Sequence, residues 1–187
     1  LNTMFIRYGN NAQGKYVKTA IAYTPTEHKI DIAKVDANAC RIVERLQKNG
    51  YESYIVGGAV RDLLLGNKPK DFDIATAATP TKIRTIFRNS RVIGKRFRLV
   101  HIYVGEQIYE VSTFRSTQDG SVGNRYGRIE EDVRRRDFSC NALYYDPTKE
   151  LLIDYVEGLK DIQSNILKPV ISRKVIFEED PVRLIRA

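Results

Sequence analysis

Residues 68–80 read KPKDFDIATAATP, and the alternation around Phe72 in this stretch decides the fold. In a β-strand, residues i and i+2 point to one face and the residue between them points to the other. The pattern therefore predicts that Phe72 faces the core while Asp71 and Asp73 stand together on the opposite face. Two carboxylates at this spacing repel each other unless a cation lies between them. A solvated edge strand with two ordinary surface aspartates has the same pattern, so these residues alone do not choose between the two interpretations.

Divalent cations would remove the repulsion between Asp71 and Asp73. Mg²⁺ binds through a few carboxylates together with waters and substrate phosphates. A pair of such ions can stabilise the attacking and the leaving oxygen of an in-line phosphoryl displacement. The metal-binding interpretation therefore predicts phosphoryl-transfer chemistry at these two aspartates.

The segment GGAVRD, residues 57–62, supports the metal-binding interpretation. A glycine pair at the start of a helix lets backbone N–H groups approach a phosphate closely, and Arg61 can reach the same anion. A tight strand-to-helix turn would also explain the two glycines. Because one short helix fits between Gly58 and Asp71, a strand–glycine–helix–strand order brings the glycines and the aspartates to one edge of a sheet.

Composition narrows the class of protein. The chain has 187 residues, 42% of them hydrophobic, which predicts one domain with a sizeable core and the start of a second. Its net charge of +8 favours a polyanionic partner, although a basic solvated surface has the same composition. No apolar run has the length of a membrane span. Cys40 and Cys140 have no CxxC partner and only two histidines are present, which excludes a standard zinc site on this chain and favours free thiols in a reducing cytoplasm.

Hydrophobic periodicity and turn residues predict the elements of an α/β (α+β) fold, a mixed sheet with helices packed against it. A helix over 31–50 begins at Asp31 as N-cap, and a second begins at Thr79 with Pro80 in its first turn. Strands are expected at 52–58, 71–76, 91–94, 98–104, 107–114 and 151–156, with helices at 59–66, 79–89 and 158–165. Residues 115–130 read as a mobile loop, 130–145 as a helix entering a strand, and 180–187 as the start of a further helix.

Several motifs in order identify a family. The stretch YIVGGAVRDLLLGNKPKDFDIATAATP, residues 54–80, resembles the class II nucleotidyltransferase signature of bacterial poly(A) polymerases and CCA-adding tRNA nucleotidyltransferases. The resemblance continues through EVSTFR (110–115), RRDFSCNAL (135–143), YVEGLKDI (155–162) and EEDPVRLIRA (178–187). It covers about residues 31–187 and implies a nucleotidyltransferase-type mixed β-sheet flanked by helices.

The resemblance also implies roles for the matched residues. Asp71 and Asp73 would bind Mg²⁺ or Mn²⁺ and Glu110 would complete the catalytic acids, although its strand pattern also fits a solvent-facing residue. The residues that would bind the nucleotide are Gly57, Gly58, Arg61, Asp62, Arg136, Asp137, Asn141, Asp180, Arg183 and Arg186. Among these, Asp62 would orient Arg61, and the spacing of Asp137 and Asn141 predicts that they share one helix face.

The two activities of the family share these motifs, and the stretch RVIGKRFRLVHI, residues 91–102, favours one of them. It is similar to the poly(A) polymerase form. The implied reaction is template-independent transfer of AMP from ATP to the 3′ end of an mRNA or tRNA, with release of pyrophosphate, in a cytoplasmic enzyme without membrane attachment. CCA addition to tRNA is the alternative. His101 in this stretch is expected to be a structural strand residue.

We expect three regions: a flexible arm at 1–30 with a short strand near 15–23, a catalytic head at 31–170, and the start of a helical neck at 171–187. Because the chain begins at Leu1 and stops within a helical pattern, it reads as a piece of a longer protein. Asp180 and Arg183, which would read the base, then lie on a frayed turn. A nucleotide- or RNA-binding module without catalysis is therefore the alternative from another class of function.

Overall fold

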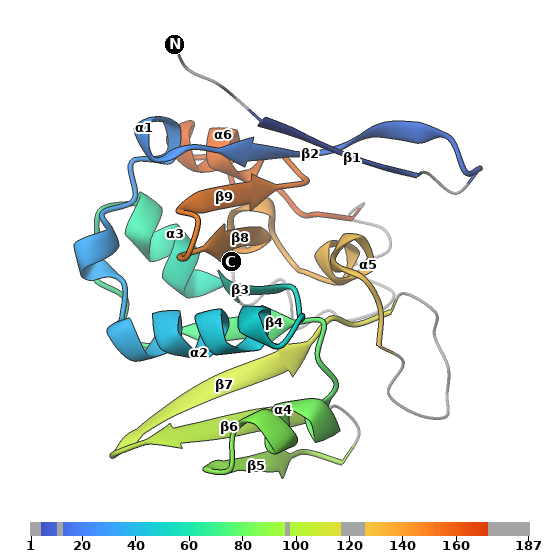
Figure 1. The fold of residues 1–187 in the computed structure, drawn as a ribbon. Coiled ribbons are helices and arrows are strands. Elements are labelled where there is room, and N and C mark those ends of the chain that lie inside the picture. Colours follow the sequence, from blue (N-terminus) through green and yellow to red (C-terminus); the bar gives the residue numbers. More distant parts are fainter. Residues whose placement is uncertain (1–4, 11–12, 96–97, 117–125, 172–187) are drawn as a thin grey trace.

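The computed structural model describes residues 5–10, 13–95, 98–116 and 126–171. Its nine strands form one sheet in the order β1-β2-β9-β8-β3-β4-β7-β6-β5 (Figure 1). The strands are β1 (Phe5–Asn10), β2 (Tyr16–Tyr23), β3 (Ser53–Val56), β4 (Asp73–Thr76), β5 (Ser90–Ile93), β6 (Leu99–Val104), β7 (Gln107–Thr113), β8 (Leu143–Asp146) and β9 (Leu151–Asp154). The helices are α1 (Pro25–His28), α2 (Ala37–Lys48), α3 (Gly58–Leu64), α4 (Pro80–Ile86), α5 (Ile129–Arg134) and α6 (Gly158–Gln163), with 3₁₀ turns η1 (Ile32–Lys34) and η2 (Ser139–Asn141).

The sheet is mixed, as predicted. β4 and β7 pair in parallel, with Ile74 opposite Val111, whereas the other pairs between described strands are antiparallel. A parallel pair needs a crossover, and here the crossover contains α4, β5 and β6. The predicted hairpin at Gly105–Glu106 is confirmed, because Val104 pairs with Gln107 and Gly105 has a φ of 59°.

One face of the sheet, which we call the helical face, is covered by α2, α3, α4 and α6. Apolar residues of these helices share one buried cluster with inward-facing residues of the central strands, among them Leu46, Ile55, Ile74, Ile83 and Val111. In Figure 1 this face is toward the viewer, with α2 and α4 in front of the strands. The helices bury their apolar stripes here, so this face supplies most of the hydrophobic stabilisation.

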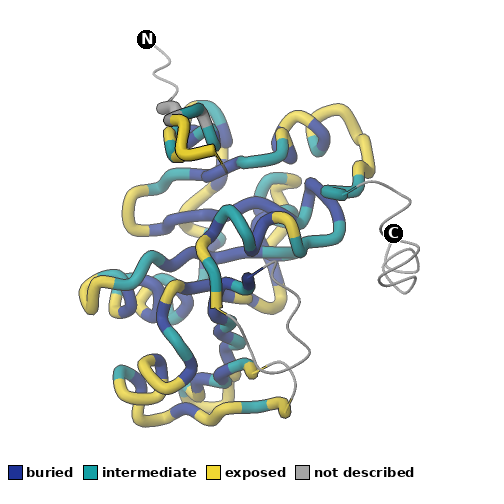
Figure 2. Tube along the Cα trace, turned by 90° about the vertical axis from the view of Figure 1, so that its right-hand side faces the viewer, coloured by how far each residue is buried: buried dark blue, intermediate teal, exposed yellow. Residues whose placement is uncertain are grey.

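The opposite face, which we call the cleft face, has a smaller buried cluster. Ile129 and Val133 of α5 pack there against Phe114 and against Tyr144 of β8. No residue of β5 or β6 belongs to this cluster, although Val100 and Ile102 of β6 lie in the cluster of the helical face. In Figure 2 the buried residues run through the centre of the molecule, and the exposed residues lie mostly at its periphery.

The described part of the N-terminal segment differs from the predicted arm. Strand β2 pairs with β1 and with β9, so both strands belong to the sheet, and their hairpin extends beyond its body (Figure 1). The physical reason is the alternation in β2: Ala20 and Ala22 enter the cluster of the cleft face, whereas Tyr23 enters that of the helical face. The short strand expected near 15–23 is confirmed as β2. The asparagines, Gly14 and Pro25 are turn-forming residues, and they favoured a flexible arm over a pair of strands that belongs to the sheet.

The first predicted helix is two elements. Asp31 caps only the 3₁₀ turn η1, where its side chain accepts from the Ala33 N–H. Asp36 caps α2 and accepts from the N–H groups of Asn38 and Ala39. Asp31 and Asp36 both fit the N-cap pattern, and the apolar spacing continues across both elements. For this reason the sequence pattern predicted one helix where the structure has a 3₁₀ turn and a separate α-helix. The predicted stop at Gly50 is confirmed by its φ of 86°.

Other predictions are confirmed with small shifts. Thr79 caps α4 and accepts from the Lys82 N–H, with Pro80 in the first turn. The loop prediction at 115–130 falls largely on residues outside the described ranges, as do 172–187 and the predicted cap at Asp180. None of the helices in the described part of the chain has the length and apolar character that a membrane span requires.

Candidate active site

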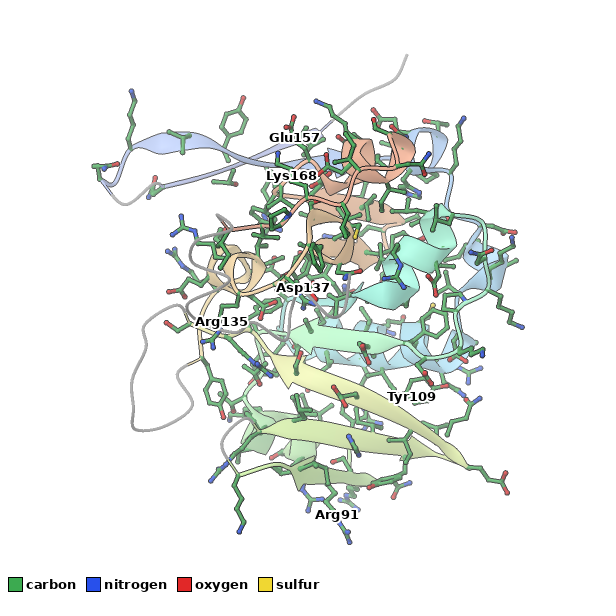
Figure 3. The ribbon with its side chains drawn as sticks, turned by 180° about the vertical axis from the view of Figure 1, so that it is seen from behind. Arg91, Tyr109, Arg135, Asp137, Glu157 and Lys168 are labelled. Atoms are coloured by element: carbon green, nitrogen blue, oxygen red, sulfur yellow. The ribbon has the colours of Figure 1, made fainter. Side chains whose placement is uncertain are left out.

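A cleft of about 500 Å³ opens on the cleft face, between the ends of β3, β4 and β7 on one side and α5 and the η2 segment on the other. The residues that line it come from segments far apart in the sequence: Val56, Gly57, Gly58, Arg61, Asp73, Ile74, Leu99, Glu110, Ser112, Arg115, Asp132, Arg135, Arg136, Asp137 and Asn141. Figure 3 views the sheet from this side, with Arg135 and Asp137 near its centre and α2 behind the strands.

The glycine corner closes one end of the cleft. Gly57 has a φ of 71°, a left-handed conformation that favours glycine, and it precedes α3 directly. A Cβ on Gly58 would lie 3.3 Å from a guanidinium nitrogen of Arg61, so the second glycine leaves room for that arginine. Val56 pairs with Asp73 across β3 and β4, which sets this corner beside the aspartate.

The predicted acidic residues lie at and next to the cleft. Strand β4 begins at Asp73, so Asp71 and Phe72 precede the strand, yet the alternation persists: Phe72 is buried and both aspartates are exposed. Asp73 and Glu110 line the cleft, and Asp71 is absent from its described lining. Although water reaches the Asp73 side chain, the protein atoms around it partly desolvate the carboxylate. This desolvation, followed by the negative charge of Glu110, raises the pKa of Asp73 above its ordinary value; Asp71 adds to the rise, and Arg136 opposes it.

These carboxylates fit a divalent cation. The charged form of Asp73 is disfavoured by its surroundings, and a cation beside it would offset both the burial and the repulsion from Glu110. In the described part of the chain, no three acidic, histidine or cysteine side chains are grouped closely enough to hold a metal by themselves. Mg²⁺ needs only one or two carboxylates when waters and substrate phosphates complete its shell, so the donor set remains suitable.

A chain of polar contacts crosses the cleft from α3 to the η2 segment. Arg61 donates to Asp62 Oδ1 at 3.2 Å and to Asn141 Oδ1 at 2.9 Å, and Asn141 Nδ2 donates to Asp137 Oδ1 at 3.3 Å. The prediction that Asp62 contacts Arg61 is thus confirmed. Asp137 and Asn141 are in contact, but the shared helix face was wrong, because α5 ends at Arg134 and η2 spans only Ser139–Asn141.

A second hydrogen-bond network fixes the side of the cleft formed by α5 and β8, which we call the back wall. Arg136 donates to Asp132 Oδ2 at 3.1 Å and to the Tyr144 hydroxyl at 3.0 Å, and that hydroxyl donates to Asp132 Oδ2 at 2.7 Å. The other oxygen of Asp132 accepts from the backbone N–H of Arg115. Burial opposes the charge of Arg136, but Tyr144 and Asp132 outweigh it and raise its pKa. The guanidinium is therefore fixed in its charged form at the cleft.

The structure adds cleft residues that sequence reasoning missed. Asp132 is buried and lies four positions before Arg136, a helical spacing that could have predicted the ion pair. Arg115 and Arg135 line the cleft as well, and burial, with the charge of Arg135 next, lowers the pKa of Arg115. Arg115 stands at the end of the EVSTFR motif, which offered a signal for it. Four arginines thus face one cleft and give it the positive charge that a polyphosphate needs.

Eight of the predicted site residues line this cleft: Gly57, Gly58, Arg61, Asp73, Glu110, Arg136, Asp137 and Asn141. Asp62 contacts Arg61 from outside the lining. Asp180, Arg183 and Arg186 lie outside the described residues. The glycine pair, acidic residues and arginines therefore converge from four separate segments of the chain, 57–61, 73, 110–115 and 132–141.

Residues 53–168 match the family model described as the poly A polymerase head domain. The Poly(A) polymerase I of Escherichia coli is 41% identical over 198 residues, which cover 97% of this chain and 43% of that protein. The CCA-adding enzyme of Staphylococcus aureus is 38% identical over 151 residues, covering 78% and 38%. The chain spans less than half the length of these relatives.

A solved structure has the same fold. The crystal structure of the Bacillus stearothermophilus CCA-adding enzyme in complex with CTP matches with a TM-score of 0.71 and 39% identity, over 79% of this chain and 36% of that one. The resemblance stated from the motifs and the predicted fold class are both confirmed.

Proposed function

This chain belongs to the poly A polymerase head-domain family, and from that premise we propose that it is the catalytic head of an enzyme that transfers AMP from ATP to an RNA 3′ end. One observation carries the proposal: the glycine corner, Asp73 and Glu110, and the arginines meet in a single cleft. In the reaction the 3′-oxygen of the RNA bonds to the α-phosphorus of ATP. The bond to the β-phosphate oxygen breaks, pyrophosphate leaves and the 3′-hydroxyl loses its proton.

The triphosphate is bound by the positive half of the cleft. Gly57 and Gly58 let the phosphates approach the backbone, and Arg61 supplies a cation that Asp62 and Asn141 hold in place. Arg136 supplies a second cation, fixed by Asp132 and Tyr144. Both guanidinium groups are already positioned in the protein, so little reorganisation is required when negative charge develops.

The carboxylates lie opposite. Asp71 and Asp73 would hold a divalent cation, and Glu110 would complete the catalytic acids. Such an ion would supply positive charge at the α-phosphate and favour loss of the 3′-hydroxyl proton. Asp137 and Asn141 line the same cleft and would contact the sugar of the nucleotide. Asp180, Arg183 and Arg186 stay proposed nucleotide-binding residues on sequence grounds alone.

The adenine specificity is proposed from the 91–102 stretch and from the 41% identity to Poly(A) polymerase I. A second candidate, CCA addition to tRNA, is supported by the 39% identity to a CCA-adding enzyme solved with CTP. Both activities use the same glycine, carboxylate and arginine residues, so the cleft does not separate them. The partner in either case is an RNA 3′ end, and the net charge of +8 suits it.

One assay separates the two candidates. The natural full-length protein is incubated with Mg²⁺ and either an RNA primer or a tRNA that lacks its terminal CCA, once with ATP alone and once with CTP and ATP. We expect long adenylate tails with ATP alone. Addition that stops after C, C and A would assign CCA addition instead, and the absence of any transfer would refute the nucleotidyltransferase proposal.

A further inference from the structure

Beside the cleft, one part of the sheet is left uncovered on the cleft face. Paired residues of neighbouring strands point to the same face, and Glu110 of the cleft pairs with His101, which pairs with Arg91. The same face carries Leu99 at the cleft and, at the far end of the hairpin, Tyr103 opposite Ile108. We call these residues the open strip: Arg91, Leu99, His101, Tyr103, Ile108 and Glu110.

The open strip is accessible in the described part of the chain. The buried cluster of the cleft face includes no residue of β5 or β6, and α4 packs on the helical face of these strands. Tyr103 is 36% exposed and Ile108 56%, and Arg91 is also exposed. Figure 3 shows Arg91 on β5, on the side of the sheet that faces the viewer and away from the labelled residues of the cleft.

Charge identifies the class of ligand. Residues 89–105, which include β5 and β6, contain four lysines and arginines and no aspartate or glutamate. Lys95 and Arg98 are exposed at the β5–β6 turn, next to the strand that carries Arg91. An exposed basic edge beside an exposed aromatic ring is the combination that single-stranded nucleic acid binds, through phosphate contacts and base stacking.

The position of the open strip beside the cleft indicates which part of the nucleic acid it would bind. The strip begins at the cleft, where Leu99 and Glu110 are part of the lining, and runs along β6 to Tyr103. At a strand rise of about 3.3 Å per residue, Tyr103 lies about 13 Å from Leu99, which is outside the cleft but still beside it. A ligand on the strip would therefore be continuous with one in the cleft.

We propose that the open strip binds the single-stranded RNA immediately upstream of the 3′ end, with a base stacked on Tyr103 and a phosphate bound by Arg91. The inference rests on the proposed function, because that function brings the 3′-hydroxyl to Asp73 and Glu110. His101, which lies 3.5 Å from Glu110, stands where the RNA leaves the cleft. The strip positions the primer and takes no part in the transfer itself.

The test uses the natural full-length protein, a 5′-labelled oligoadenylate and four variants. Tyr103→Ala should raise the Kd for the oligoadenylate at least about fivefold, whereas Tyr103→Phe, which retains the ring, should not. Arg91→Gln should weaken binding and reduce the slope of log K against log salt by about 0.7. Lys82→Gln is the matched control, because Lys82 is exposed on α4, which packs on the helical face.

Steady-state kinetics separate this inference from the proposed function. In Tyr103→Ala and Arg91→Gln, the KM for the RNA primer should rise while kcat and the KM for ATP match the unmodified protein, which also shows that the variants fold. If both variants have the Kd, salt slope and primer KM of Lys82→Gln, the strip does not bind RNA. If the unmodified protein transfers no nucleotide, the proposed function fails, and the Kd and salt-slope measurements still test the strip.

Discussion

The two faces of the sheet have different physical characters. The helical face is covered by four helices and its cluster consists of apolar and aromatic side chains. The cleft face has a smaller cluster under α5, and beside it lie the buried Asp132, the Arg136 guanidinium and the carboxylate of Asp73. Burying charge is unfavourable unless it is paired, and even paired charges contribute little net stability. The comparison indicates that the helical face stabilises the fold and thereby allows the cleft face to hold charges in fixed positions.

The largest effect should come from Asp73→Asn, which removes a carboxylate from the cleft face. We expect nucleotide transfer to fall at least about a thousandfold, about 4 kcal/mol, because the cation that stabilises the transition state loses a ligand. The melting temperature should stay the same or rise, since burial and Glu110 already disfavour the charge of Asp73. Primer extension and thermal unfolding measure both.

Asp31→Asn provides the matched control, because Asp31 is exposed and caps η1 away from the cleft, where asparagine caps equally well. Activity of Asp73→Asn within tenfold of that control would contradict the role given to the aspartate.

Leu46→Ala makes the complementary change on the helical face. Leu46 lies on the inner side of α2 and is fully buried, so we expect a loss of about 3–4 kcal/mol in the free energy of unfolding, from lost burial and the cavity left behind. At temperatures where the variant is folded, kcat should be unchanged. Urea unfolding followed by circular dichroism gives the first quantity. Leu65→Ala, at a leucine that is 53% exposed, should change stability little, and equal losses in the two variants would mean that this face is not the stabilising one.

Asp132→Asn tests whether charge on the cleft face is held by pairing. Asparagine has no charge and only one acceptor oxygen, so Arg136 loses its ion pair and the groups now bonded to the two carboxylate oxygens cannot all keep an acceptor. We expect a loss of about 3 kcal/mol in stability together with lower activity. Tyr144→Phe removes two hydrogen bonds, one donated to Asp132 and one accepted from Arg136, and leaves the ion pair, so it should cost about 2 kcal/mol. If Asp132→Asn were the milder of the two in urea unfolding, the ion pair would not be what holds this wall.

The smallest effect concerns His28, a buried ionisable residue whose ring contacts Tyr145 of the cluster on the helical face. Its Nδ1 accepts from the Ile30 N–H and its Nε2 donates to the Glu150 carbonyl, an arrangement that requires the neutral ring. Burial lowers its pKa below the ordinary value of 6.5, despite the Glu150 carbonyl.

Because the folded-state pKa of His28 is lowered, the stability it contributes is present above pH 6.5 and is lost as the pH falls below that value. His28→Gln should lower stability by about 1 kcal/mol at pH 8 and should have a melting temperature that falls less than that of the unmodified protein between pH 8 and pH 5. Identical pH profiles would show that the ring is not buried in its neutral form.

Local patterns predicted much of the fold. The glycine corner, the cap at Thr79, the hairpin at Gly105–Glu106 and the alternation around Phe72 each depend on a few adjacent residues, and each is confirmed. The sequence pattern predicted a short strand at β2 but not that it belongs to the sheet, because its partner β9 lies far along the chain. Sheet membership depends on such distant pairing, which alternation alone does not reveal.

The site divides in the same way. Gly57, Asp73 and Arg136 stand in motifs and were predicted, and the structure brings all three to the cleft. The role of Asp132 was missed because it lies outside the matched motifs and acts through Arg136 and Tyr144, although its four-residue spacing from Arg136 offered a signal. Asp71 precedes strand β4, which begins at Asp73, and its negative charge still raises the pKa of Asp73, so its predicted role stays a prediction.

The parallel pairing of β4 with β7 has a consequence for the order in which the site is completed during synthesis. β3, α3 and β4 are adjacent in the chain, so the glycine corner and Asp73 can come together as soon as they leave the ribosome. Glu110 joins them only after the whole crossover of α4, β5 and β6 has been translated and has returned β7 to its place beside β4. The glycine corner and Asp73 are therefore synthesised before Glu110, and Glu110 is synthesised together with the strands of the proposed RNA-binding strip.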